Sequence, residues 1–270
     1  MNDLMRSFQA LAVRPGHFAL LPLGQHSFVL RTAGHQVAFD PYLTAEAARL
    51  VPPPIGPEEL ADCDLILGSH DHGDHIDRPS LPAIAKAASH AVMVVPEAVR
   101  ATVPFPAERL KGMNDGGVLE ADGIRVSAVA AAHELLDRDP ATGLYPYLGY
   151  VVEADGVVIY HSGDCCLYDG LQKRLASFGR LTAAFLPING RDAWRLTHGF
   201  IGNMDAHEAV ELAGELDAGT LVPGHHDMFA PNLGDMKECV AFARAKYPAL
   251  RVLPPRTGHV QRICGTIKEN

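Results

Sequence analysis

The sequence is short of basic residues, of long apolar runs and of paired cysteines, and each shortage excludes a class of protein. The 23 Lys and Arg are outnumbered by 32 Asp and Glu, and the resulting net charge of −9 predicts no nucleic-acid partner because an acidic surface repels phosphates. No apolar stretch approaches the roughly 20 residues of a membrane span, so we expect no membrane partner. The five cysteines lack zinc-finger spacing, and residues 1–12 lack the apolar core of a secretion signal; both features predict a cytoplasmic protein with reduced thiols.

Short apolar runs alternate with turns and helical segments along the whole chain. The spacing predicts strands at 18–23, 27–31, 37–39, 65–67, 91–95, 124–131, 147–152, 157–161, 183–187 and 220–222. Helices are expected at 44–50, 78–88, 167–178 and 205–216. No repeat or linker divides the chain, so we expect one α/β domain over residues 1–270. The antiparallel start and mixed order favour two sheets packed face to face with helices outside.

The stretch His70-Asp71-His72-Gly73-Asp74-His75 carries the strongest chemical signal. It holds three imidazoles and two carboxylates directly after the apolar run 65–67, where Gly68 and Ser69 end the expected strand. His70 and His72 are two residues apart, so an extended loop points both side chains the same way, while Asp74 and His75 face a neighbouring position. Nitrogen and oxygen ligands in this arrangement are typical of two adjacent metal ions that share a water.

Three further ligand-type residues follow expected strands: His133, Asp164 and His225. Because one loop cannot surround an ion, we group His70, His72 and His133 as one site. Asp74, His75 and His225 form the second, with Asp164 as a bridge. Alternatives stay open at three positions. Asp164 would also serve as a helix cap. His226, next to His225, is either the ligand in place of His225 or a support behind it. Asp40 is either a turn residue or a support behind the metal.

The ligand order resembles the metallo-β-lactamase superfamily, whose His-x-His-x-Asp-His signature is matched by His70–His75 and followed by His133, Asp164 and His225. The resemblance implies a four-layer αββα sandwich over essentially the whole chain, with mixed sheets, helices on both outer faces and the metals at one edge. Aspartate at position 164 is similar to the wider hydrolase branch, since the β-lactamases proper often have cysteine there.

A narrower set of segments resembles the cytoplasmic L-ascorbate-6-phosphate lactonases. The segments begin at Gly24, Asp40, Ser69, Pro187 and Gly202. This resemblance implies hydrolysis with two divalent ions, zinc or manganese with iron not excluded, and assembly into a homo-oligomer. It indicates Asn189, Arg191 and Asn203 as contacts for the substrate, with a polar loop that caps the helix beginning at Asp205 as the open alternative. Cys165 and Cys166, which border the expected site, have no counterpart in the lactonase pattern.

The predicted function is hydrolysis of a small-molecule substrate by a metal-bound hydroxide, with Asp74 and Asp164 holding the ions and orienting the nucleophile. The leading hypothesis is an enzyme that opens a small anionic lactone, sugar-derived or phosphorylated, within the broad class of ester-bond hydrolases. A phosphodiesterase is the alternative enzyme, because two metals also clamp a phosphoryl displacement. A metal-binding protein without turnover is the alternative from another class, since a fold does not determine a function.

Overall fold

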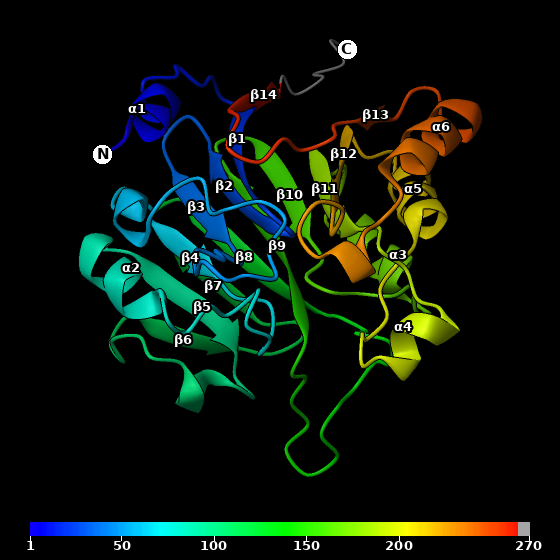
Figure 1. Ribbon diagram of the computed structural model, residues 1–270. Coiled ribbons are helices and arrows are strands. Elements are labelled where there is room, and N and C mark those ends of the chain that lie inside the picture. Colours follow the sequence, from blue (N-terminus) through cyan, green and yellow to red (C-terminus); the bar gives the residue numbers. More distant parts are fainter. Residues whose placement is uncertain (264–270) are drawn as a thin grey trace.

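Two seven-stranded sheets face each other in the computed structural model, which describes residues 1–263 (Figure 1). The first sheet has the order β14-β1-β2-β3-β4-β5-β6, antiparallel from β14 to β3 and parallel from β3 to β6. Its strands are β1 (Phe18–Gly24), β2 (Ser27–Arg31), β3 (Gln36–Phe39), β4 (Leu65–Leu67), β5 (Val92–Pro96), β6 (Leu110–Met113) and β14 (Gln261–Ile263).

The second sheet repeats this mixture of antiparallel and parallel pairing. Its order is β13-β12-β11-β10-β9-β8-β7, antiparallel from β7 to β10 and parallel from β10 to β13. Its strands are β7 (Val118–Ala121), β8 (Ile124–Ala130), β9 (Leu148–Ala154), β10 (Val157–His161), β11 (Ala183–Pro187), β12 (Thr220–Gly224) and β13 (Arg251–Val252).

Alternation along the strands divides the apolar side chains between a central core and two outer ones. In β1, Phe18 and Leu20 pack into the layer between the sheets, whereas Ala19 and Leu21 point to the opposite face. The central layer joins residues of both sheets, among them Phe39 and Phe185, whose rings stack at 6.2 Å. Both faces of each sheet are therefore buried, and helices cover the outer ones.

Helices lie on both outer faces, as the sequence predicts. The helices are α1 (Asp3–Gln9), α2 (Leu81–Ala87), α3 (Leu171–Ala176), α4 (Ala193–Thr197), α5 (Ala206–Glu215) and α6 (Met236–Lys246). Helices α1 and α2 pack on the first sheet, and α3, α5 and α6 pack on the second. Single 3₁₀ turns occur at Pro57–Leu60, Arg100–Thr102 and Ala230–Asn232. The four-layer αββα prediction is confirmed for the described residues.

The helix expected at 44–50 is wrong. The side chain of Asp77 accepts hydrogen bonds from the backbone N–H groups of Leu43 and Thr44 at 2.8 Å, so Asp77 holds the start of this segment. The Arg49 guanidinium lies over the Tyr42 ring and donates to the Tyr42 and Thr44 carbonyls. These side chains hold residues 44–50 as an irregular segment with one turn at 47–48, because they compete with intrahelical hydrogen bonds.

Candidate metal centre

One edge of the sandwich collects the ends of four strands that carry the expected ligands. The loop from His70 to His75 follows β4, and His133, Asp164 and His225 follow β8, β10 and β12. Strands β8 and β10 both run antiparallel to β9, and β12 is parallel to β10 through β11, so the carboxyl ends of all three meet at one edge. The topology therefore brings together residues that lie far apart in the sequence.

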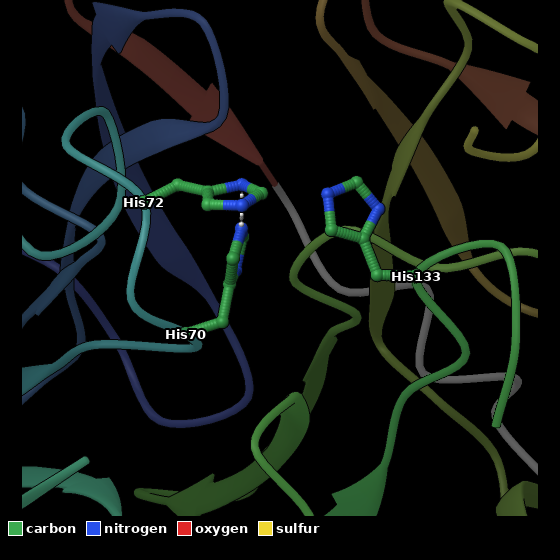
Figure 2. Close-up of side chains that lie close together, drawn as sticks. All are labelled: His70, His72 and His133. Atoms are coloured by element: carbon green, nitrogen blue, oxygen red, sulfur yellow. Dashed lines mark hydrogen bonds between the residues drawn. The ribbon is translucent and has the colours of Figure 1, made fainter. Parts of the chain in front are cut away.

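The first group is His70, His72 and His133, each with a ring nitrogen within 4.8 Å of the others (Figure 2). His70 Nε2 lies 2.9 Å from His72 Nδ1. His133 faces these two rings from the loop after β8, on the other sheet (Figure 2). Three imidazoles converging in this way are a common ligand set of catalytic zinc sites.

Two further groups overlap the first. One is His70, His75 and Asp164, and the other is Asp74, His75 and His225. Asp164 lies close to residues of both predicted half-sites, because its Oδ1 is 3.3 Å from His75 Nε2 and 2.7 Å from His225 Nε2, while its Oδ2 is 3.6 Å from His133 Nε2. The three groups thus include both predicted half-sites, and the group of His70, His75 and Asp164 spans the two.

Hydrogen bonds behind the rings determine which nitrogens face the centre. His75 Nδ1 donates to Asp40 Oδ2 at 2.6 Å, His133 Nδ1 donates to the Gly202 carbonyl at 3.1 Å, and His70 Nδ1 donates to Ser69 Oγ at 3.0 Å. Each donation leaves the lone pair on Nε2, which points the other way. Metal-ligating histidines in proteins show this same support by a carboxylate, carbonyl or other acceptor.

The buried polar atoms of the centre fit divalent ions. His75 Nε2 and His225 Nδ1 are buried without a hydrogen-bond partner, and Asp164 Oδ1 and His225 Nε2, although 2.7 Å apart, are not aligned as a hydrogen bond. Buried polar groups are costly unless they are paired or coordinate a metal. Divalent ions would satisfy His75 Nε2, Asp164 Oδ1 and one ring nitrogen of His225, and would balance the carboxylates.

The electrostatics agree with that interpretation. Burial alone would raise the pKa of Asp164, but His225 and His75 lower it well below its usual range, so it is ionised. Burial and the neighbouring His75 lower the pKa of His70 well below its usual value, which keeps this imidazole neutral as a ligand must be. Burial would lower the pKa of His75 too, but Asp164, Asp74 and Asp40 raise it to about 10, which reflects a negative potential suited to a cation.

The positions of Asp164, His225 and Asp40 in the fold bear on the three alternatives that the sequence left open. Helix α3 begins at Leu171 with Gly170 as its N-cap, so Asp164 does not cap it. The expected start of that helix at 167 is four residues too early. His225 takes part in the metal-type groups, whereas His226 belongs to none of those found within residues 1–263. Asp40 lies behind His75 and also accepts hydrogen bonds from the backbone N–H and the hydroxyl of Ser69.

The three residues expected to contact substrate have other partners here. Asn203, 1% exposed, donates to Asp164 Oδ2 at 3.0 Å and to Asn189 Oδ1 at 3.2 Å. Asn203 therefore orients Asp164, and Asn189 in turn supports Asn203. Arg191 forms a bidentate pair with Glu208 of α5, with both N···O distances 2.8 Å. Substrate contact by these residues stays a prediction.

Residues close to the ligands also show what the sequence reasoning missed. Gln25, at the tip of the β1–β2 hairpin, donates to Asp74 Oδ2 at 2.8 Å. The ring of Tyr147 is centred 5.3 Å from that of His133. Cys165 is buried, and its burial raises the pKa of the thiol to about 12, so it is no nucleophile. The sequence pattern that could have indicated Gln25 is a polar pair, Gln25-His26, directly after Gly24 at the end of an apolar strand.

Comparison with known proteins agrees with the fold and the ligand set. Residues 35–226 match the family model described as the Beta-lactamase superfamily domain. A UPF0173 metal-dependent hydrolase of Thermococcus onnurineus is 33% identical over 217 residues, covering 80% of this chain and 88% of the relative. The chain belongs to the UPF0173 metal-dependent hydrolase family within the beta-lactamase superfamily.

Solved structures share the fold of this metal-dependent hydrolase. The metallo hydrolase Igni18 of the archaeon Ignicoccus hospitalis superposes with a TM-score of 0.68 at 21% identity, covering 92% of this chain and 98% of that one. An isothiocyanate hydrolase from Delia radicum gut bacteria gives a TM-score of 0.71 at 18% identity, covering 92% and 99%. At these identities the likeness is one of fold alone. No helix within residues 1–263 is both long and apolar enough to cross a membrane.

Proposed function

We propose that this hydrolase opens a lactone, or cleaves a closely related carboxylic ester, with two divalent ions, zinc or manganese. The observation that carries the proposal is the pair of half-sites, His70, His72, His133 and Asp74, His75, His225, with the Asp164 carboxylate between them. When bound, divalent ions supply a water of lowered pKa and polarise the scissile carbonyl. Iron would fit the same nitrogen and oxygen donors.

The side chains of this chain contribute positioning and charge. Asp164 and Asp74 would hold the ions, and Asn203 and Gln25 orient these two carboxylates by one hydrogen bond each. Asp40 holds His75 in the tautomer that directs Nε2 to the centre. Ser69 is fully buried and donates to Asp40, so it is not available as a nucleophile. The attacking group is therefore water.

The surface near the centre supports a substrate with an apolar portion. Leu135 is 74% exposed two residues after His133, and Trp194 is 52% exposed on α4, a helix that buries none of its own residues. Ile201, also exposed, precedes Gly202, whose carbonyl binds His133. Loop 134–146 and α4 lie at the same end of the molecule (Figure 1). An alkyl group on the lactone would cover side chains that otherwise contact water.

The test is a substrate panel with and without metal. The protein is stripped of metal by chelation, reloaded with zinc or with manganese, and assayed on neutral, alkyl-substituted and phosphorylated lactones, a thioester and a phosphodiester. We expect lactone opening to disappear on chelation and return on reloading. Hydrolysis of the phosphodiester alone, or full activity after chelation, would contradict the proposal. The anionic substrate, the cytoplasmic location and the homo-oligomer stay predictions.

A further inference from the structure

The tip of the β1–β2 hairpin enters the candidate metal centre. Gly24 pairs with Ser27, so Gln25 and His26 form the turn between them. Gln25 has a φ of 57°, in the left-handed region that glutamine rarely adopts, and its side chain is buried. A strained residue of this kind persists only when its surroundings hold it in place, and such residues concentrate at functional sites.

Three hydrogen bonds hold Gln25, and two of them reach expected ligands. Its side-chain amide donates to Asp74 Oδ2 at 2.8 Å, and its carbonyl accepts from the backbone N–H of His225 at 2.9 Å. Its own backbone N–H donates to Asp227 Oδ1 at 2.9 Å, and Asp227 is held in turn by the Thr257 hydroxyl at 2.6 Å. Gln25 thus links two separate ligand segments to one anchored turn.

The packing around the tip leaves it little freedom. A Cβ added to Gly224, the residue before His225, would lie 1.9 Å from His26 Nδ1, so the hairpin tip presses against the end of β12. By contrast, a Cβ at Gly73 would meet nothing within 4 Å, so there is open space beside the residue that precedes Asp74. Because the backbone N–H and carbonyl of Gln25 are both hydrogen-bonded, its side-chain amide has a fixed origin from which it can orient the Asp74 carboxylate.

We infer that Gln25 is a positioning residue for one half of the metal centre, the half formed by Asp74, His75 and His225. Within residues 1–263 Gln25 has no hydrogen bond to His70, His72 or His133, so the other half should not depend on it. By fixing the Asp74 rotamer and the backbone of His225 before the ion arrives, Gln25 reduces the ordering that binding would otherwise require. The inference rests on the proposed two-ion function and assigns Gln25 to one ion of the pair.

The experiment measures two dissociation constants for zinc on the metal-free full-length chain, by competition with a chromophoric chelator. Gln25→Asn suits the left-handed backbone but is too short to reach Asp74, and Gln25→Ala removes the amide altogether. Gln36→Ala is the matched control, because Gln36 is 4% exposed like Gln25 and donates to Cys63 Sγ, away from the ligands. We expect one constant to rise about 10–100-fold in both Gln25 variants, with the other unchanged.

The His72→Ala background identifies which ion is affected. This variant should keep only the ion held by Asp74, and adding Gln25→Asn should then weaken that remaining binding by the same factor. Unchanged dissociation constants in Gln25→Asn would overturn the inference. So would an equal rise of both constants together with a Tm lowered as far as in Gln36→Ala. If the wild-type protein binds two ions and opens lactones while the Gln25 variants match it, only this inference fails. If the wild type binds no divalent ion, the proposed function fails with it.

Discussion

Asp40 shows how much of the centre depends on a residue that would not touch an ion. Its carboxylate is 1% exposed, accepts from His75 Nδ1 at 2.6 Å and receives both donors of Ser69. Its backbone φ of 43° lies in the left-handed region, where aspartate and asparagine are tolerated better than other side chains. Asp40 lies in a bend after β3 and also hydrogen-bonds His75, so a role behind the metal stays a prediction that substitution can test.

Asp40→Asn should weaken metal binding while the fold survives. Asparagine keeps the shape and the backbone preference, but its amide can donate to His75 Nδ1 and so shift the proton to Nε2, which then cannot bind a metal. We expect metal affinity and lactone hydrolysis to fall about 10–100-fold. The measurement is a metal titration beside a thermal melt.

Asp77→Asn is the control for this substitution. Asp77 is 2% exposed, but its partners are the backbone N–H groups of Leu43 and Thr44 and the hydroxyl of Ser80. The Asp77→Asn substitution should lower Tm and leave metal affinity unchanged. If both variants lose only stability, Asp40 is a turn residue and nothing more.

Arg191 can be tested for two roles: binding an anionic substrate, which the sequence predicts, and pairing with Glu208, which the structure shows. Because Glu208 already neutralises the guanidinium, we expect Arg191→Ala to raise KM by the same factor for a phosphorylated and a neutral lactone. Loss of the partly exposed pair should also cost about 1 kcal/mol of unfolding free energy. Steady-state kinetics on the two lactones decide the question. A selective rise for the phosphorylated lactone would show that Arg191 leaves Glu208 to bind the anion.

At the scale of elements, hairpins join the two sheets at the edge away from the ligands. Asp155 and Gly156 form the β9–β10 turn with φ values of 49° and 79°. The Asp155 carboxylate accepts from Thr32 Oγ1 at 2.6 Å, from the Gly34 N–H at 2.7 Å and from His35 Nδ1 at 3.0 Å, all in the β2–β3 turn. One carboxylate therefore fastens a turn of one sheet to a turn of the other.

The pH dependence of this contact follows from two shifted groups. Burial lowers the pKa of His35, but hydrogen bonds to Asp155 and to the Asp122 carbonyl raise it above 6.5. The contribution of His35 to folding stability is therefore complete below pH 6.5 and is lost as the pH rises. Burial raises the pKa of Asp155, but hydrogen bonds from Thr32, Gly34 and His35 lower it below 3.8. The contribution of Asp155 to folding stability is therefore present above pH 3.8 and is lost on acidification.

Asp155→Asn should therefore destabilise the protein most between these two limits. Asparagine keeps the left-handed turn and removes the charge, and we expect a loss of about 1 kcal/mol near pH 5 that shrinks toward pH 8. Thermal melts across this range measure it. Asp122→Asn, in the Asp122-Gly123 turn between β7 and β8, is the control, since Asp122 also has a left-handed φ of 47°. A difference between the two variants that does not vary with pH would show that the His35–Asp155 pair has no ionic part.

Elements with strong apolar runs were predictable, and those with weak ones were not. Strands β10 and β11 have the bounds expected from the sequence, because their apolar residues are continuous and glycine or proline ends them. Helix α6 was missed, since within it only Cys239 and Ala243 are buried and its pattern is correspondingly weak. The contact from Gln25 to Asp74 spans 49 residues, and no local pattern encodes such a contact.

At the scale of the whole molecule, burial of apolar side chains stabilises the sandwich independently of any metal. Its central layer and two outer layers are apolar, and the ligands sit on loops at one edge, outside these layers. The topology, which local pattern leaves undetermined, is what brings His133 and His225 to the His70–His75 loop. Removing a ligand should thus empty part of the centre without unfolding the protein, because metal binding adds stability to a fold that already exists.

The most direct test of the two-ion centre is the metal content of purified wild-type and His72→Ala proteins, with lactone hydrolysis measured on the same samples. His90→Ala is the control, a histidine whose side chain is 56% exposed and lies outside every metal-type group within residues 1–263. We predict about two metal equivalents per chain for the wild type and the control, and about one for His72→Ala, with an unchanged fold and hydrolysis lost. Equal metal content in all three proteins, or full hydrolysis by His72→Ala, would contradict the account.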